Sequence, residues 1–129
     1  MREIKFRGKD IVEKWRYGDL VQEKWKSLLN TNKKSFMIKK DKTAYTVLEE
    51  TIGRFTGLKD KNGKEIYEGD ILQIDIDRAY VIWNEKYQYF QIVPIGDYYF
   101  DSDVVGQALE HLEVEVIGNI YDNPQLLKK

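Results

Sequence analysis

The chain has 129 residues, 42% of them hydrophobic and 13% aromatic, with a net charge of −1, and this length suits one domain with a sizeable core. It has no Cys and one His, which excludes a disulfide framework, a thiolate metal site and the usual zinc site of His and Cys ligands. The sequence starts without the apolar segment of a signal peptide and has no apolar run that could span a bilayer, so we expect a cytoplasmic protein without membrane contact.

The first two predicted strands lie near the N-terminus. Residues 3–7 alternate polar and apolar side chains, which predicts a half-buried strand with Ile4 and Phe6 facing the core. Residues 15–21 predict a second strand, and Gly18 within it indicates a bulge or a bend. We expect these two strands to form an antiparallel pair.

The next segment lacks a clear strand period. Residues 22–34 are predicted to be a loop with at most one helical turn, because Asn30-Thr31-Asn32 interrupts a short helical spacing. Short strands are predicted for residues 35–38 and 45–48, and the charged residues 39–42 between them form a turn.

Residues 51–76 are the most informative stretch of the chain. Asn62-Gly63 separates two strand-like runs, and this pair is typical of a type I′ hairpin turn, which needs positive φ at both central residues. Gly69-Asp70 predicts a second turn into a third strand that contains Ile71, Leu72, Ile74 and Ile76. The stretch therefore predicts a β-hairpin followed by a third strand.

The C-terminal part adds further strands and the helical elements. Strands are predicted for residues 79–83, 87–93, 98–100 and 113–120, with Pro94 ending the second of them. Asp101-Ser102-Asp103 supplies an N-cap for a short helix that runs to about His111. Asp122 or Asn123 is expected to cap a terminal helical turn that begins at Pro124.

These elements predict a mainly β fold, a small barrel or sandwich with one short helix and a C-terminal helical turn. The predicted core consists of apolar residues at inward positions of the strands. They are Phe6, Phe55, Ile66, Ile71, Ile74, Val81, Ile82, Phe90, Ile92, Val116 and Ile120. Adjacent residues of a strand face opposite ways, so Ile71 with Leu72 cannot share one core face.

The sequence contains no pattern typical of a catalytic, cofactor or metal site. Asp75 and Asp77 would lie on one face of a strand, but a Mg²⁺ or Ca²⁺ ion needs more oxygen ligands than two carboxylates. The glycines match neither a P-loop nor a dinucleotide fingerprint. His111 has no Ser or Cys nucleophile in a matching context. We expect a non-catalytic protein without a cofactor.

Aromatic residues between 83 and 99 exceed what one core needs. They are Trp83, Tyr87, Tyr89, Tyr98 and Tyr99. Aromatic side chains among cations can stack on bases, but residues 65–127 contain only Arg78 and Lys86 as cations. These aromatics are therefore predicted to form cross-strand pairs or a protein interface.

Charge is distributed unevenly along the chain. Residues 1–64 carry a net charge of +8 and residues 65–129 a net charge of −9. This asymmetry indicates either that the halves neutralise one another, within one copy or between copies, or that the basic part contacts nucleic acid. The basic residues are spread out and interrupted by acids, which favours mutual neutralisation.

Three blocks of sequence follow one another along the chain: IKFRGK at 4–9 with WRYGDLVQ at 15–22, TGLKDKNGKEIYEGDIL at 56–72, and EVIGNIYDNPQLL at 115–127. In this order they resemble the YopX family of phage and prophage proteins. The turn and motif residues in the last two blocks are Thr56, Gly57, Asn62, Gly63, Gly69, Asp70, Gly118, Asn119, Asn123 and Pro124. Segments 23–50 and 73–111 follow no family pattern.

The resemblance implies one YopX-like domain over residues 1–129, with a part similar to an SH3-like barrel, in the cytoplasm of a bacterial host cell. It implies no catalytic residues, because the function of the family is not established. The leading hypothesis is a non-catalytic protein that acts by self-association or by contact with a host or phage protein. The alternative is a nucleic-acid-binding module that uses the basic N-terminal half.

Overall fold

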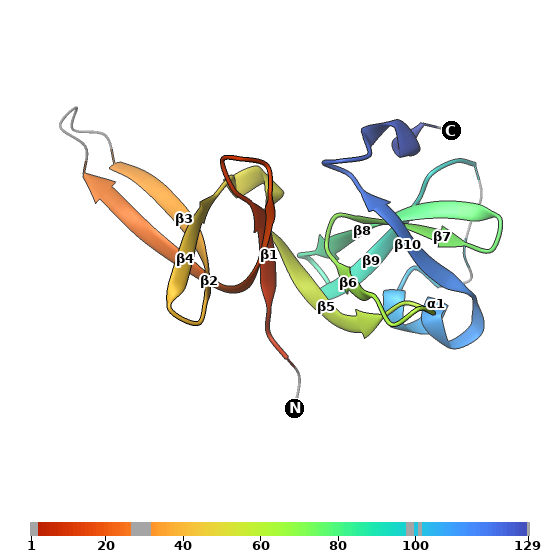
Figure 1. The fold of residues 1–129 in the computed structure, drawn as a ribbon. Helices are drawn as coiled ribbons and strands as arrows, with labels where there is room; N and C mark the ends of the chain where they lie inside the picture. The colour runs from red at the N-terminus through yellow and green to blue at the C-terminus, as the bar shows by residue number, and fades with distance from the viewer. Residues whose placement is uncertain (1–2, 27–31, 98–99, 101, 129) are drawn as a thin grey trace. The chain divides into compact units, whose positions relative to one another are not determined.

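The computed structural model describes residues 3–26, 32–97, 100 and 102–128 of the chain. The chain divides into two compact units, unit 1 (Met1–Phe55) and unit 2 (Thr56–Lys129). Both consist mainly of antiparallel strands (Figure 1), so the predicted mainly β fold class is confirmed. The described residues form no closed barrel, and the prediction of one domain stays a prediction.

Unit 1 is built from a strand meander and one 3₁₀ turn. Its elements are β1 (Phe6–Lys9), β2 (Trp15–Lys26), β3 (Asn32–Lys40), β4 (Thr43–Val47), η1 (Glu49–Thr51) and the start of β5 (Gly53–Lys59). The strands lie in the order β4-β3-β2-β1-β5. The sheet also curls, because the Leu48 N–H donates to the Lys9 carbonyl at 2.8 Å and Asp10 forms a β-bridge with Val47.

The first strand begins later than predicted. Ile4 precedes β1 and is 61% exposed, and Phe6 is only half-buried, so the predicted inward positions are wrong. Arg7 and Gly8 are the buried residues of β1. Gly8 allows a close approach, since a Cβ atom there would lie 2.9 Å from Cγ2 of Val47.

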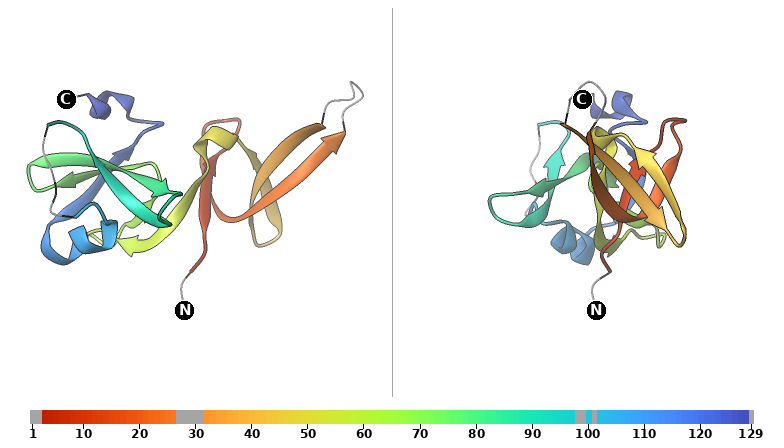
Figure 2. Two further views of the ribbon diagram at one scale, coloured as in Figure 1. Left: turned by 180° about the vertical axis from the view of Figure 1, so that it is seen from behind. Right: turned by 90° about the vertical axis from the view of Figure 1, so that its left-hand side faces the viewer.

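Residues 22–26 and 32–34 belong to strands, so the predicted loop at 22–34 is wrong for them, and residues 27–31 lie outside the described residues. The register from Leu20 opposite Ile38 continues without a shift to Lys26 opposite Asn32, and this cross-strand pairing overrides the weak local pattern. Figures 1 and 2 show the two strands extending as a ribbon beyond β1 and β4. Gly18 lets the strands approach, since a Cβ there would lie 2.3 Å from the Lys39 carbonyl oxygen.

Unit 2 contains the end of β5, the short strand β6 and a four-stranded sheet in the order β10-β7-β8-β9. Its further elements are β6 (Glu65–Tyr67), β7 (Asp70–Ile74), β8 (Asp77–Asn84), β9 (Tyr89–Pro94), α1 (Val105–His111), β10 (Val114–Asn119) and η2 (Pro124–Leu127). The predicted hairpin followed by a third strand is confirmed, as are the short helix and the C-terminal helical turn.

The core of unit 2 lies between its sheet and α1, which contributes Val105 and Ala108.

Over both units, eight of the eleven predicted core residues are buried, whereas Phe6, Ile82 and Ile120 are half-buried. Ile71 and Leu72 are both fully buried. Since neighbours on a strand face opposite ways, β7 is covered on both faces.

Three local predictions for unit 2 are wrong. Gly63 has a φ of 80°, but Asn62 has no positive φ, so the turn is not type I′. Strand β7 ends at Ile74, and Ile76 lies in a turn with 92% of its surface exposed.

The third wrong prediction concerns the caps of the helical elements. Val104 is the N-cap residue of α1 and makes no side-chain cap, while the candidate Asp101 and the predicted strand residues 98 and 99 lie outside the described residues. Asn123 precedes Pro124 at the start of η2 as predicted, but its side chain does not cap the turn. Its Oδ1 accepts a hydrogen bond from the Asn119 N–H instead.

Candidate functional site

Asp60, which lies within the sequence block at 56–72 but was not among the predicted motif residues, organises the turn between β5 and β6. Its Oδ1 accepts hydrogen bonds from the backbone N–H groups of Asn62 and Lys64, both at 2.9 Å, and its Oδ2 accepts one from Val116 at 2.9 Å. Desolvation raises the pKa of Asp60, but these donors, Val116 first among them, outweigh it and hold the pKa below its usual value. Asp60 thus ties the turn to β10.

Gly69 and Asp70 form the second motif turn. The Asp70 carboxylate is 1% exposed and accepts a hydrogen bond from the Tyr67 N–H at 2.7 Å. Gly69, with a φ of 92°, donates its N–H to the Val81 carbonyl at 2.8 Å and accepts from the Ile120 N–H at 2.9 Å. The turn therefore joins β6, β8 and the segment after β10.

The motif at the end of β10 is a set of side-chain to backbone bonds. Asn123 Oδ1 accepts from the Asn119 N–H at 3.1 Å, and Asn119 Oδ1 accepts from the N–H groups of Tyr121 at 3.0 Å and Asp122 at 2.9 Å. A Cβ at Gly118 would lie 2.4 Å from Asn123 Oδ1, so any larger residue there would have to displace the Asn123 side chain.

The motif residues Thr56 and Gly57 also shape the backbone locally. Thr56 Oγ1 donates to the Ile66 carbonyl at 2.7 Å. Position 57 has a φ of 85°, a conformation that glycine adopts more readily than other residues. The motif residues that form these bonds and turns shape the backbone of unit 2.

Three of the five aromatics predicted to form cross-strand pairs or an interface lie within the described residues. Trp83 packs edge-to-face on Phe90 with ring centroids 4.8 Å apart. The Tyr89 hydroxyl donates to Asp103 Oδ2 at 2.8 Å, and this bond raises the pKa of Tyr89. Tyr87 lies in the β8–β9 turn and is 67% exposed, while Tyr98 and Tyr99 lie outside the described residues.

The outer strands of the four-stranded sheet have chain segments along their edges. On β9, the Ile92 N–H donates to the Asp103 carbonyl at 2.8 Å, and Gln91 forms a bridge with Val104. On β10, the Val114 carbonyl accepts from the Lys61 N–H at 3.0 Å, beside the Asp60 bond to Val116. These bonds occupy edge groups that could otherwise pair with another chain.

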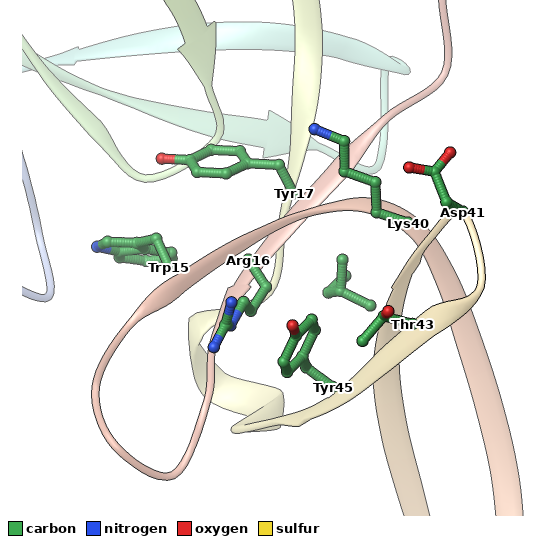
Figure 3. Close-up of a pocket in the computed structure, with 8 residues that line it drawn as sticks. Trp15, Arg16, Tyr17, Lys40, Asp41, Thr43 and Tyr45 are labelled. Atoms are coloured by element: carbon green, nitrogen blue, oxygen red, sulfur yellow. The ribbon is translucent and has the colours of Figure 1, made fainter.

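The strongest candidate site is a pocket on unit 1, which we call the unit 1 pocket (Figure 3). It has a volume of about 330 Å³ and is formed by β2, β3, β4 and the turn between β3 and β4. Its lining residues are Trp15, Arg16, Tyr17, Ile38, Lys40, Asp41, Thr43 and Tyr45. The residues that line the pocket therefore include three aromatics, two cations and one carboxylate.

Arg16 is fixed at the wall of this pocket. Its Nε donates to Asp10 Oδ2 at 2.9 Å, and its guanidinium carbon lies 3.6 Å from the centroid of the Tyr45 ring. Asp10 is itself held by the turn, because its Oδ1 accepts from the Lys14 N–H at 3.0 Å. The pKa of Asp10 is lowered, first by the Lys14 N–H and then by Arg16.

Further cations lie around Trp15. The Arg7 guanidinium carbon is 4.6 Å and the Lys9 Nζ 5.7 Å from the centroid of the Trp15 ring. Unit 1 as a whole contains 14 Lys and Arg against eight Asp and Glu, whereas unit 2 contains seven against 14. The pocket thus lies on the basic unit.

This pocket was not predicted from the sequence, because aromatic residues were considered as a binding surface only between residues 83 and 99. The signal was present in Trp15-Arg16-Tyr17, where aromatic residues alternate with a cation in the basic half. Tyr45 completes the wall from β4, and only strand pairing brings it near.

Two other predicted features have a simple structural setting. Asp75 lies in the turn before β8 with a φ of 54°, and Asp77 begins that strand, so they do not share a strand face. Among the described residues, no group of three or more His, Cys, Asp or Glu side chains could hold a metal ion. Within the same part of the chain, no helix has the length and apolar character that crossing a membrane requires.

Comparison with known proteins gives a family and a fold. Residues 5–128 match the family model described as YopX protein. The crystal structure of protein EF1440 from Enterococcus faecalis is similar with a TM-score of 0.56 and 22% sequence identity, over 99% of this chain and 100% of that chain. This likeness supports the fold alone. A comparison with curated proteins gives no match.

Proposed function

Since the chain belongs to the YopX family, we propose that it is a phage- or prophage-encoded, non-catalytic protein of the bacterial cytoplasm whose unit 1 binds nucleic acid. The observation that carries this proposal is the unit 1 pocket, where Trp15, Tyr17 and Tyr45 lie beside Arg16 and Lys40. Aromatic rings stack on bases and cations neutralise phosphates, and nucleic-acid-binding surfaces combine the two.

The charge of each unit supports the choice of unit 1. Its excess of Lys and Arg attracts a polyanion, whereas the acidic unit 2 repels one. The aromatics of unit 2 that favoured a protein interface are partly engaged within the unit, as Trp83 and Tyr89 show. The geometry therefore supports the alternative hypothesis over the leading one.

A non-catalytic role is supported by the way polar side chains of the family-like blocks are used. Asp60, Asn119 and Asn123 bind backbone groups with their side-chain oxygens. Side chains used in this way hold turns in place. The motif blocks thus supply a scaffold for the variable segment 23–50, which contributes Lys40 and Tyr45 to the pocket.

Fluorescence anisotropy with a labelled oligonucleotide at several salt concentrations tests the proposal. Phosphate contacts make the logarithm of the affinity fall linearly with the logarithm of the salt concentration. Lys40→Ala should reduce the steepness of this dependence by about 1, the value for one phosphate contact. Lys86→Ala in unit 2 is the matched control and should change nothing. Absent binding, or binding that salt does not weaken, contradicts the proposal.

Self-association is a second candidate, and one observation favours it. In the described part of the chain, residues 20–26 of β2 pair with β3 alone, so the other edge of this strand offers unpaired backbone groups. Such an edge can pair with the same strand of a second copy. We propose this edge as the contact between two copies.

A further inference from the structure

We propose that Arg16 recognises guanine through the N7 and O6 atoms of the base, so that unit 1 prefers guanine-containing nucleic acid. This inference rests on the proposed function and names the base that the bound nucleic acid presents. Guanine offers two acceptor atoms side by side, and two parallel N–H groups of an arginine fit this pair. The surroundings of Arg16 leave it such a pair of donors.

One donor of the Arg16 guanidinium is already occupied. Its Nε donates to Asp10 Oδ2 at 2.9 Å, and the Asp10 side chain is only 7% exposed. Asp10 is fixed in turn, because its Oδ1 accepts from the N–H groups of Val12 and Lys14, both at 3.0 Å. The carboxylate therefore holds Arg16 by Nε and leaves the end of the guanidinium, Nη1 and Nη2, for a ligand.

The Tyr45 ring supports one face of the same guanidinium. The guanidinium carbon of Arg16 lies 3.6 Å from the centroid of the ring, a contact distance for a cation over an aromatic face. Figure 3 shows the guanidinium beside Tyr45 and apart from Lys40 and Asp41. Because Arg16 is held along one edge and on one face, it has little conformational freedom left to lose when a ligand binds.

The end of the guanidinium is available to a ligand. In the described part of the chain, Nη1 and Nη2 of Arg16 make no hydrogen bond, since the contacts of this side chain are those with Asp10 and Tyr45. Neither nitrogen is buried, and the side chain is 22% exposed. Two donors therefore reach the solvent side by side, at a spacing that the planar guanidinium fixes.

The Asp10 carboxylate favours a base edge over a phosphate as the ligand of these donors. Asp10 keeps its negative charge at neutral pH, because the Lys14 N–H first of all, and Arg16 as well, lower its pKa. It lies 2.9 Å from Arg16 Nε and would repel a phosphate, whereas guanine N7 and O6 are uncharged acceptors. Adenine has the donor N6 in place of O6 and would meet one N–H of Arg16 with another.

A change of one atom in the ligand tests the proposal without altering the protein. Two labelled single-stranded 12-mers carry either isolated guanines or 7-deazaguanines, in which a carbon replaces N7. The intact chain should bind the guanine 12-mer about tenfold more tightly, because one donor of Arg16 loses its acceptor in the other. The salt dependence should be the same for both, and equal affinities would overturn the guanine contact.

Two variants test whether this preference belongs to Arg16 and its support. Arg16→Lys keeps the charge but lacks the paired donors, so the preference should disappear while the salt dependence remains. Asp10→Asn keeps an oxygen for the N–H groups of the turn, but its amide nitrogen cannot accept from Arg16, so the preference should fall several-fold. Lys14→Ala, at an exposed position of the same turn, is the matched control and should keep the preference.

The outcomes separate this proposal from the one on which it rests. A guanine preference that survives in Arg16→Lys overturns the base contact, as does a structural role of Arg16, which would lower stability and leave the preference unchanged. If Arg16→Ala weakens both 12-mers equally and reduces the salt dependence by about 1, Arg16 contacts a phosphate. This result also overturns the guanine contact but leaves nucleic-acid binding standing. Binding of neither 12-mer overturns both proposals.

Discussion

The carboxylate of Asp60 accepts a hydrogen bond from the backbone N–H of Val116 at 2.9 Å, across 56 residues of sequence. The same carboxylate holds the turn between β5 and β6 through Asn62 and Lys64. One side chain thus shapes a local turn and attaches an edge strand to it. Its removal should therefore affect the whole of unit 2.

Asp60→Asn should destabilise the protein. The amide has one acceptor oxygen in place of two, so at least one buried N–H group loses its acceptor, and this loss costs about 1–3 kcal/mol. Urea unfolding at pH 7 measures the change. Asp75→Asn, at an exposed turn position with a φ of 54°, is the control and should change stability by less than about 0.5 kcal/mol.

Acid should remove the contribution of Asp60. Desolvation raises the pKa of Asp60 in the folded state, but the N–H donors of Val116, Lys64 and Asn62 lower it by more, so the net shift is downward. The stabilisation is therefore fully present above the unfolded-state pKa of about 3.9 and is lost as the pH falls through the lower folded-state pKa. The free energies of unfolding of the wild type and of Asp60→Asn, measured between pH 7 and pH 2, should become equal as the pH falls. A difference between the two that stays constant with pH would contradict this account.

Gly118→Ala should destabilise unit 2 by about 1–3 kcal/mol, because a Cβ would lie 2.4 Å from Asn123 Oδ1 and displace it from the Asn119 N–H. Gly106→Ala is the matched control. A Cβ at that helical position lies 3.7 Å from Leu58, an ordinary contact, and Ala favours helix over Gly. Thermal unfolding should give a lower Tm for the first variant and an unchanged or higher Tm for the second.

Ile74→Ala should cost about 2–5 kcal/mol, because Ile74 is 1% exposed in the core of unit 2 and its truncation leaves a cavity. Ile76→Ala, two residues further in the exposed turn, should change stability by less than about 0.5 kcal/mol. Chemical denaturation of the pair measures the difference. Equal losses would mean that the register of β7 is wrong.

The hairpin turn should depend on Gly63 rather than Asn62. The sequence predicts positive φ at both, which would make Asn62→Val costly, but only Gly63 has it. Gly63→Ala should therefore cost about 1 kcal/mol although no atom lies within 4 Å of the added Cβ, and Asn62→Val should cost less. A larger loss of unfolding free energy for Asn62→Val than for Gly63→Ala would indicate a type I′ turn instead.

Sedimentation at micromolar concentration tests self-association. If the open edge of β2 forms the contact, a dimer should persist at moderate salt, because backbone pairing and apolar contact are weakly screened. Gln22→Lys places a charge on an exposed position of this edge and should favour the monomer. A single monomeric species for the wild type at low and moderate salt would defeat the prediction.

Part of the fold could be predicted from patterns that are local in sequence. Gly63, Gly69 and the alternation around Ile74 predict two turns and three strands because backbone preference and side-chain period act within a few residues. Pro124 marks the start of η2 for the same reason, since its fixed φ suits the first position of a helical turn.

Features that depend on distant partners could not be read. The strand at residues 22–26 exists because β3 pairs with it, and Arg7 is buried beside Trp15 although a charged residue usually predicts an exposed position. The unit 1 pocket is of the same kind, because Arg16 of β2 contacts Tyr45 of β4 only through the pairings of both strands with β3. Tertiary contacts decide such positions over local propensity.

The strand order also sets when each unit can be completed during synthesis. All strand pairings of unit 1 close within the first 55 residues, whereas β10 pairs with β7 and receives its Asp60 contact only after residues 114–119 have been made. On a translating ribosome the basic unit therefore has all its pairing partners before the acidic unit gains its last strand. Until residues 114–119 have left the ribosome, β7 has one unpaired edge, and a chain stalled or truncated before them would present that edge to other chains.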